Sequence, residues 1–283
     1  MSAVAAEVDA RGANVVAGGV MRAGAALVLG LLVLAAVWPG LFTAYSPTEV
    51  DPALALRPPG GGHLLGTDQL GRDIWTRIVY GTRLSLFTGL AATALAVAGG
   101  TCAGLLAALG GRAADQAVMR TADVLLALPG MLLALIVITV LGPGQGSALI
   151  AIAVSEMPGY ARMIRARALV VRRAEYVDAA VVLGLPHRSV VARHILPNSL
   201  SPLLVLATLG TGTAILAGSA LSFLGLGVRP PQPEWGALLA EGREFLATAW
   251  WLALFPGLAI TVTVVAVNVM GRHLRLRFEG RRA

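Results

Sequence analysis

The most informative polar stretch of this sequence is residues 172–198, which separates two long apolar runs. Its acids Glu175 and Asp178 stand beside the small residues Ala179 and Ala180. Small side chains on one helix face let another surface approach closely, and the acids can pair with basic groups or cap the local helix. These residue types predict a docking element and not a centre of covalent chemistry.

The same stretch has the pattern of a helix-turn-helix. Residues at the i, i+3, i+4 and i+7 spacing of one helix face are Tyr176, Ala179, Ala180 and Leu183. Gly184 can take the left-handed conformation that ends a helix, Pro186 suits the first turn of a second helix, and Pro197 is expected to end that helix. From patterning alone, the alternatives are an amphipathic hairpin lying on the inner leaflet and, for the acids, a plain solvated helix face.

Two further polar segments flank other apolar runs, at about residues 39–83 and 224–244. In the first, Thr67 or Asp68 is a plausible N-cap. Ile74, Trp75 and Ile78 follow, and they predict an apolar helix face resting on the outer membrane interface. The alternative is a surface helix that only connects two spans.

Glu156 is an acid within an apolar run. An intramembrane acid is by default a hypothesis for a functional site, and this one would contact an amino group of a substrate or pair with a basic residue such as Arg162. Arg162 lies six residues on, too far for a pair on the same helix face, so a partner on another helix is expected. The alternative is an acid that snorkels to the inner interface.

Several chemistries are excluded by residue type. All 22 basic residues are arginine, which excludes a lysine-containing phosphate-binding loop and a lysine Schiff base. The single cysteine, Cys102, allows no internal disulfide, and the four histidines have no metal-ligand spacing. We therefore expect no enzyme activity, no bound metal and no cofactor in this chain.

Composition indicates lipid as the solvent, because 57% of residues are hydrophobic and 13% are charged, against roughly a quarter charged in soluble domains. A spanning helix needs about 20 mostly apolar residues. Six segments qualify, at about 23–42, within 84–111, at about 121–141, at about 147–164, within 198–223 and within 245–271. The fold class is therefore an all-α membrane protein with six transmembrane helices.

The arginines fix the orientation. With the N-terminus in the cytoplasm, sixteen arginines fall inside, and six fall outside, namely Arg57, Arg72, Arg77, Arg83, Arg229 and Arg243. This positive-inside bias predicts that both termini are cytoplasmic. The alternative for the first apolar run is a secretory signal peptide, but an uncleaved anchor is favoured because the run is long enough to span and the preceding region holds acids as well as arginine.

Residues 172–198 resemble the EAA loop of ABC importer permeases. The acid-Ala-Ala element appears as Asp178-Ala179-Ala180, Gly184 follows it, and Ile195-Leu196-Pro197 falls at the family spacing. The resemblance implies that this loop is a coupling helix seated in a groove of an ATPase subunit. The implied contact residues are Glu175, Tyr176, Asp178, Ala179, Ala180, Gly184, Leu185, Pro186, His187, Arg188, Ile195 and Pro197.

Two outer elements resemble the C-type permeases of dipeptide, oligopeptide and nickel importers. The first, before the second span, includes Gly66, Thr67, Asp68, Gly71, Arg72 and Asp73. The second, after the fifth span, includes Pro230, Pro231 and Trp235. Trp250 and Trp251 also fit an aromatic belt at the start of the sixth span. Three motifs in the correct order extend the resemblance from about residue 27 to 272.

The resemblance implies the type I ABC importer permease fold in the cell membrane and an ATP-driven import function, with peptides as the expected substrate. It also implies a B-type permease partner, two ATPase subunits that bind the ATP and Mg²⁺, and an extracytoplasmic binding protein, with no role for nucleic acid. The expected organisation is a tail at 1–22, a first span at 23–42, an outer segment at 43–83, a core at 82–272 with its coupling loop at 165–197, and a basic tail at 273–283.

Glu156 departs from this pattern, because relatives carry an aromatic residue just before the Pro-Gly-Tyr-Ala-Arg element that begins at Pro158. Relatives with these motifs also handle nickel chelates, glutathione and haem, so these substrates are alternatives. A secondary transporter and a structural or receptor membrane subunit remain as other functions. A secondary transporter would often show internal repeats or several intramembrane charges, and only Glu156 and Asp123 are candidates here.

Overall fold

The computed structural model describes the backbone of residues 2–279, with side chains described for residues 19–275. Its α-helices are α1 (Ser2–Val37), α2 (Ile74–Leu109), α3 (Gly111–Ala127), α4 (Gly130–Leu141), α5 (Gln145–Val171), α6 (Glu175–Val182), α7 (His187–Val190), α8 (Leu196–Phe223), α9 (Trp235–Gly242) and α10 (Trp251–Glu279). A π-helical turn, Val191–Ile195, joins α7 to α8. Within these residues the extended segments form only isolated bridges, so the expected all-α class is confirmed.

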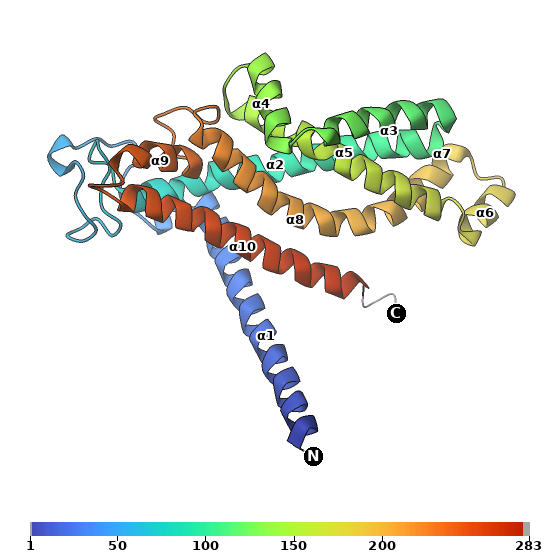
Figure 1. Cartoon of the computed structure of the whole chain (residues 1–283), viewed down its shortest axis with the longest axis horizontal. Coiled ribbons are helices and arrows are strands. Elements are labelled where there is room, and N and C mark those ends of the chain that lie inside the picture. The colour runs from blue at the N-terminus through green and yellow to red at the C-terminus, as the bar shows by residue number, and fades with distance from the viewer. Residues whose placement is uncertain (1, 280–283) are drawn as a thin grey trace.

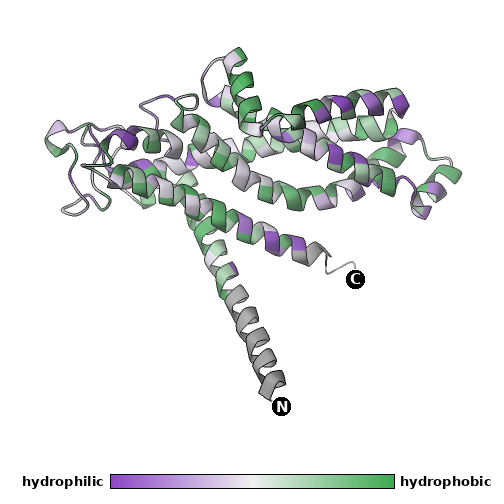
Figure 2. Cartoon of the chain, viewed as in Figure 1, coloured by the Kyte–Doolittle hydropathy of each residue, from purple (hydrophilic) through white to green (hydrophobic). Residues whose placement is uncertain are grey.

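The helices form an elongated bundle with two distinct ends (Figure 1). At one end, residues 43–73 fold over the start of α2 and pack with α9, and we call residues 43–73 together with α9 the cap. At the other end, α6 and the loop that joins it to α7 protrude beyond α2 and α5, and we call residues 172–190 the knuckle. The Ser2 end of α1 and the Glu279 end of α10 both lie away from the cap. Figure 2 shows that hydrophilic residues gather in α3, the knuckle and the loops of the cap, whereas hydrophobic residues prevail along the other helices.

Helix α2 is the centre of the bundle, and its packing against α5 is more extensive than that of any other helix pair. Small residues make this approach possible. A side chain at Gly100 would come within 2.6 Å of Tyr160 Cβ, and one at Gly104 within 2.5 Å of the Ala161 carbonyl oxygen. Two glycines four residues apart are the usual device for close helix packing in membranes, where lipid removes the hydrophobic drive for helices to associate.

Within the described part of the chain, four helices are long and apolar enough to cross a membrane, and each contains or overlaps an expected span. They are Gly19–Val37, Ile74–Leu109, His187–Phe223 and Trp251–Arg275. The first packs on the last, because Ala25 lies buried against Ala266 and Val269. The sequence therefore placed these four apolar helices correctly, although two of them begin about ten residues before the expected starts at Leu84 and Asn198.

The third expected span, at about 121–141, is wrong as a single straight helix. Helices α3 and α4 together pass the same test of apolarity, but they meet at an angle of 102°. Leu128 and Pro129 have extended backbone, with ψ of 140° and 129°. Proline disfavours the helical conformation in the residue before it, so the chain bends at Leu128.

The fourth expected span lies within α5. This helix is 27 residues long, but it is not among the helices apolar enough to qualify, since Glu156, Arg162 and Arg165 interrupt it. Helix α5 nevertheless packs against α2, α4, α8 and α3 and leaves a polar face uncovered. The count of six spans therefore stays a prediction, which depends on how the polar face of α5 is covered.

Candidate functional site

The knuckle begins with α6, whose first turn carries two acids. Glu175 and Asp178 are exposed there. The amide groups of a helix N-terminus are partly positive, so acids stabilise the first turn. Ala174, the N-cap residue, makes no side-chain cap, which leaves this charge effect as the local stabilisation of the helix start.

Gly184 ends α6 as expected. Its φ of +77° is left-handed, its amide donates to the Val181 carbonyl over 2.9 Å, and the Leu185 amide donates to the Ala180 carbonyl over 3.2 Å. These two hydrogen bonds are the pair that defines a Schellman motif, which satisfies the last carbonyls of a helix. Pro186 follows as the N-cap of α7. The chain thus turns sharply between two short helices, as the sequence predicted.

The knuckle is held from beneath by its own apolar residues. Val177 and Ala180 are buried with Val190, Ile195 and Ala168 in one cluster. The prediction that Tyr176, Ala179, Ala180 and Leu183 form one face for docking is therefore wrong for Ala180. This residue is 6% exposed and packs within the chain itself. The side chains that remain available to another molecule are those of Tyr176 (47% exposed), Ala179, Val181 (58%), Val182 (86%) and Leu183 (78%).

The second half of the predicted docking segment also differs from expectation. Pro197 does not end a helix, because α7, the π-helical turn and α8 run on as one helix from His187 to Phe223. In the wider π-helical turn the Leu196 amide donates to the Val191 carbonyl, and Pro197 then falls in the first turn of α8. Pro197 has no amide hydrogen and so leaves a gap in the hydrogen-bond ladder of this continuous helix, and the wider turn directly before it accommodates that gap. His187 and Arg188 are exposed, whereas Ile195 is buried.

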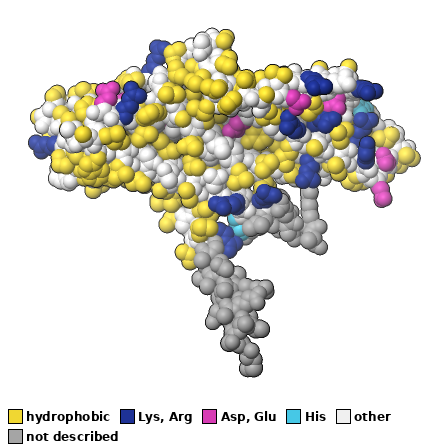
Figure 3. Space-filling model, in the orientation of Figure 1, with side chains coloured by type: hydrophobic (Ala, Val, Ile, Leu, Met, Phe, Trp, Pro, Cys, Tyr) yellow, Lys and Arg dark blue, Asp and Glu magenta, His cyan; other side chains and the backbone are white. Residues whose placement is uncertain are grey.

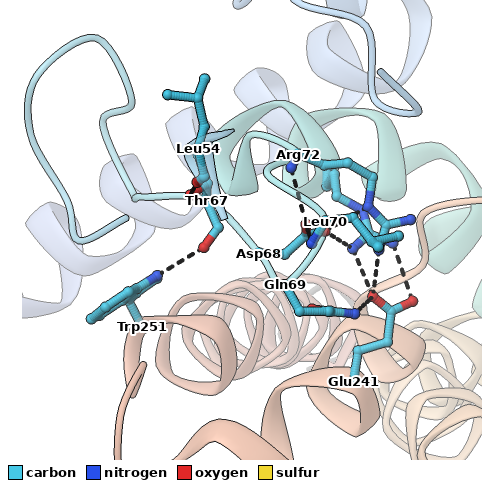
Figure 4. A network of polar contacts seen from close by, with 9 residues as sticks. Leu54, Thr67, Asp68, Gln69, Leu70, Arg72, Glu241 and Trp251 are labelled. Carbon is cyan, nitrogen blue, oxygen red and sulfur yellow. Dashed lines mark hydrogen bonds and ion pairs between the residues drawn. The ribbon is translucent and has the colours of Figure 1, made fainter. Parts of the chain in front are cut away.

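At the cap, the first outer motif forms a buried ionic network (Figure 4). Asp68 accepts hydrogen bonds from Arg72 Nε at 2.6 Å and from Arg77 Nη1 at 2.7 Å. Glu241 of α9 accepts from the same two guanidinium groups, over 3.0 Å from Arg72 and over 2.7 and 3.2 Å from Arg77. Two arginines and two acids thus join the motif loop to α2 and to α9.

The network has an electrostatic consequence for Glu241. Burial acts to raise the pKa of this carboxyl, but the hydrogen bonds from Arg77 and the charges of Arg77 and Arg72 outweigh it and hold the pKa below its usual value. Sequence reasoning missed both Arg77 and Glu241 as members of the site. They lie 164 positions apart, so no local spacing could have paired them.

The remaining motif residues set the backbone of the cap. The N-cap of α2 is Asp73, which accepts a hydrogen bond from the Thr76 amide over 2.8 Å. The prediction of Thr67 or Asp68 as the N-cap is therefore wrong. Thr67 is instead fully buried and donates to the Leu54 carbonyl. Gly66 and Gly71 have φ of +80° and +76°, and a side chain at either would collide with backbone, so these positions of the motif need glycine.

Ile74 and Ile78 do not rest on the membrane interface, because both are buried in the core beneath the cap. The prediction that Trp251 is an interfacial anchor is wrong. Its side chain is 5% exposed, and its indole nitrogen donates to the Thr67 carbonyl over 3.1 Å. Trp250, 51% exposed, is free to take that role.

The second outer motif is also structural. Pro230 and Pro231 are joined by a cis peptide bond, and the fully buried Trp235 donates to the Ile78 carbonyl over 3.0 Å. Glu234 caps α9 through the Ala237 amide and accepts from Ser85 Oγ, each over 3.0 Å. Both outer motifs therefore build the cap and leave few of their own polar groups for an external partner.

Glu156 lies near the middle of α5 and its side chain faces α8, a position that does not favour the alternative of an acid snorkelling to the inner interface. Thr213 Oγ1 of α8 donates to Glu156 Oε1 over 3.0 Å. The expectation that Glu156 finds a partner on another helix is thus confirmed, and Arg162 is paired instead with Asp123 of α3 at 2.7 Å. Arg165 pairs in the same way with Asp115, which gives a row of charges between α3 and α5.

Comparison with known proteins bears on the whole chain. The sequence profile of the family described as binding-protein-dependent transport system inner membrane component matches residues 100–280. The chain is 43% identical over 249 residues to the dipeptide transport system permease protein DppC of Alkalihalophilus pseudofirmus, covering 88% of this chain and 82% of that protein. It is 42% identical over 217 residues to the glutathione transport system permease protein GsiD of Pectobacterium atrosepticum, covering 77% and 72%.

Among solved structures, the fold is similar to that of a chain in the inward facing MetNI methionine ABC transporter. The TM-score is 0.56 at 18% identity, and the match covers 71% of this chain and 96% of that one. At this identity the likeness concerns the fold.

Proposed function

The chain belongs to the family of binding-protein-dependent transport system inner membrane components, and from this premise we propose that it is the C-type permease subunit of an ATP-driven importer of dipeptides and related peptides. It forms half of the pathway across the membrane and performs no covalent chemistry itself. ATP and Mg²⁺ are bound and ATP is hydrolysed in partner subunits.

The observation that carries this proposal is the knuckle. Its tip exposes Val182 and Leu183 at 86% and 78%, although a Schellman turn and a buried underside hold it in one shape. Exposed aliphatic side chains on a rigid protruding turn suit insertion into a groove of another protein, since little conformational entropy is lost on binding. We infer that this groove belongs to an ATPase subunit, which moves the knuckle when it binds nucleotide.

For the topology, we infer that the knuckle is cytoplasmic and the cap is extracytoplasmic, in line with the arginine distribution. The Ser2 end of α1 and the Glu279 end of α10 both lie away from the cap, which agrees with two cytoplasmic termini. We count α5 and the bent pair α3–α4 as spans, giving six. Helix α5 is polar because its exposed face does not meet lipid.

For the partners, we propose a B-type permease, two ATPase subunits and an extracytoplasmic binding protein that docks on the cap. The motif side chains of the cap are buried, so their part in docking is to fix its shape. The exposed cap residues, Leu64 and Leu70 among them, are the ones placed to touch the binding protein.

Co-purification tests the proposal. The chain, expressed with its genomic neighbours, should retain a lysine-bearing P-loop ATPase, and Val182→Asp should abolish that retention because a charge enters the apolar contact. Leu64→Asp is the matched control, since Leu64 is 72% exposed on the cap at the opposite end. Retention of the ATPase by Val182→Asp, or its loss in Leu64→Asp alone, would contradict the assignment of the knuckle.

The substrate is open to one specific alternative. The similarity to a glutathione permease favours glutathione over nickel chelates or haem as the second candidate. Uptake of radiolabelled dialanine and of glutathione by the reconstituted complex separates the two. Uptake that proceeds without ATP would instead indicate a secondary transporter.

A further inference from the structure

A row of polar side chains follows the surface of the bundle from the middle of α5 toward the knuckle. Glu156 and Thr213 come first, followed by the pair Asp123–Arg162 and then the pair Asp115–Arg165. Figure 3 shows acidic and basic side chains on this face of the molecule. At 1.5 Å per residue the row extends about 13 Å along α5.

Charged side chains at membrane depth do not face lipid, because hydrocarbon offers them no hydrogen bonds. The Asp123–Arg162 pair is about half exposed in this chain, and the Thr213 hydroxyl is exposed as well. This face therefore meets either a water-filled pathway or a partner protein.

Glu156 differs from the other acids of the row, because within the described part of the chain it has no basic partner. Its Oε2 is buried without a hydrogen bond of good geometry from any described residue, although the Tyr160 hydroxyl is a neighbouring donor. Its Oε1 accepts from Thr213, but that hydroxyl also lies 2.8 Å from the Gly210 carbonyl, and a hydroxyl has one hydrogen to give. The carboxylate thus has two neutral hydroxyl neighbours but no cationic partner among the described residues, and an unpaired charge is costly in a region of low dielectric constant.

The surroundings of Glu156 are preorganised. Gly210 of α8 leaves no room for a side chain, because a Cβ there would collide with the Tyr160 hydroxyl and approach Glu156 Oε2 to 3.6 Å. Tyr160 is itself 8% exposed. The acid is therefore held against α8, with the exposed Thr213 marking the side from which a ligand can reach it.

We propose that Glu156 and Thr213 bind the free ammonium group of a peptide as it passes the middle of the membrane. This inference rests on the proposed function. An ammonium group carries a positive charge, three donors and no acceptor, which complements a carboxylate without a cationic partner and the hydroxyl oxygen beside it. The groove farther along the row is lined by three arginines against two acids, and its Arg120, Arg162 and Arg165 suit the carboxylate of the same peptide as it moves toward the knuckle.

The first experiment asks whether the site is wet and selects cations. Thr213→Cys is made in a Cys102→Ser background, and the complete transporter in nanodiscs is treated with a cationic reagent, methanethiosulfonate ethylammonium, or an anionic one, methanethiosulfonate ethylsulfonate. The ratio of the two modification rates should fall about tenfold when Glu156→Gln is added, as expected for removing a unit charge a few ångströms away. Glu156→Asp, which keeps the charge, should retain most of the ratio.

The second experiment measures ATP-dependent uptake of dialanine into proteoliposomes with the cognate binding protein. Glu156→Gln should lower uptake about tenfold and Glu156→Asp less, while both still co-purify with the ATPase. If the unmodified transporter takes up no peptide, the proposed function fails. If it does, and Glu156→Gln matches it, only the ammonium site fails. Resistance of the Thr213→Cys variant to both reagents in the assembled complex would show that a partner covers this face, and would overturn the inference.

Discussion

Replacing Arg77 by glutamine should destabilise the cap far more than the same change at Arg83, six residues along the same helix. Arg77 is 1% exposed and donates three hydrogen bonds, one to Asp68 and two to Glu241. Arg83 is exposed and makes no ion pair or hydrogen bond with described residues. The two positions thus separate the effect of the network from the loss of an arginine.

The magnitude follows from what the change leaves behind. Glutamine at position 77 leaves Asp68 and Glu241 with Arg72 as their one remaining cationic partner. Removing one member of a buried charge network costs about 3–5 kcal/mol, because a charge stays buried without compensation. Replacing the exposed Arg83 by glutamine should change the free energy of unfolding by no more than about 0.5 kcal/mol.

Thermal unfolding in detergent, followed by tryptophan fluorescence, measures the difference, because Trp235 and Trp251 are buried in or beneath the cap. Adding Glu241→Gln to Arg77→Gln should cost less than the sum of the two single changes, since the acid left unpaired is then neutral. Equal unfolding temperatures for the Arg77 and Arg83 variants would refute the view that the network holds the cap.

The same network predicts how the cap responds to acid. The pKa of Glu241 is lowered in the folded chain relative to its ordinary value of 4.5. A lowered pKa means that the folded state favours the ionised form, so the resulting stability is fully present above about pH 4.5 and is lost as pH falls through the lower folded-state value. Below that pH, the unfolding temperature of the wild type should therefore fall more steeply with decreasing pH than that of Glu241→Gln.

Three further predictions test other parts of the fold. Trp251→Phe should cost about 1–2 kcal/mol by leaving a buried carbonyl without its donor, whereas Trp250→Phe should be nearly neutral in the same unfolding assay. Gly104→Ala should lower the yield of folded protein because its methyl meets a backbone carbonyl, whereas Gly99→Ala meets the flexible end of a methionine and should be tolerated. Gly184→Val should reduce peptide-stimulated ATP hydrolysis by the complex without loss of the bundle, since a β-branched residue resists a φ of +77° but has open space around it.

The sequence predicted well those features that a short window of residues determines. The Gly184 turn is one example, because a left-handed cap requires a residue type and a position that are visible together. The four apolar spans are another, because hydropathy over about 20 residues reflects the thickness of a bilayer. The bend at Leu128 was also available locally from Pro129, but the apolar run beyond it masked the break.

Features that depend on distant partners were not predictable in this way. Thr67 or Asp68 was expected as an N-cap, but Thr67 donates to the Leu54 carbonyl and Asp68 accepts from Arg72 and Arg77, contacts that depend on how the whole loop folds. Trp251 has the sequence position of an interfacial tryptophan, but its indole nitrogen donates to the Thr67 carbonyl. In each case the polar group forms a tertiary hydrogen bond, and the local sequence had indicated a different role for it.

The continuous helix from His187 to Phe223 connects the knuckle to the cap mechanically, and the sequence did not predict this connection. Its 37 residues extend about 55 Å, from the buried side of the knuckle at Val190 to the cap. At the cap it is fixed against α9, because Gly236 lies on the backbone of Ser219 with no room for a side chain. A displacement of the knuckle therefore reaches α9 along a helix whose one irregular turn, Val191–Ile195, lies next to the knuckle. Thr213 lies on this helix beside Glu156, so we infer that a movement transmitted along the helix would also displace Thr213 relative to Glu156 of α5.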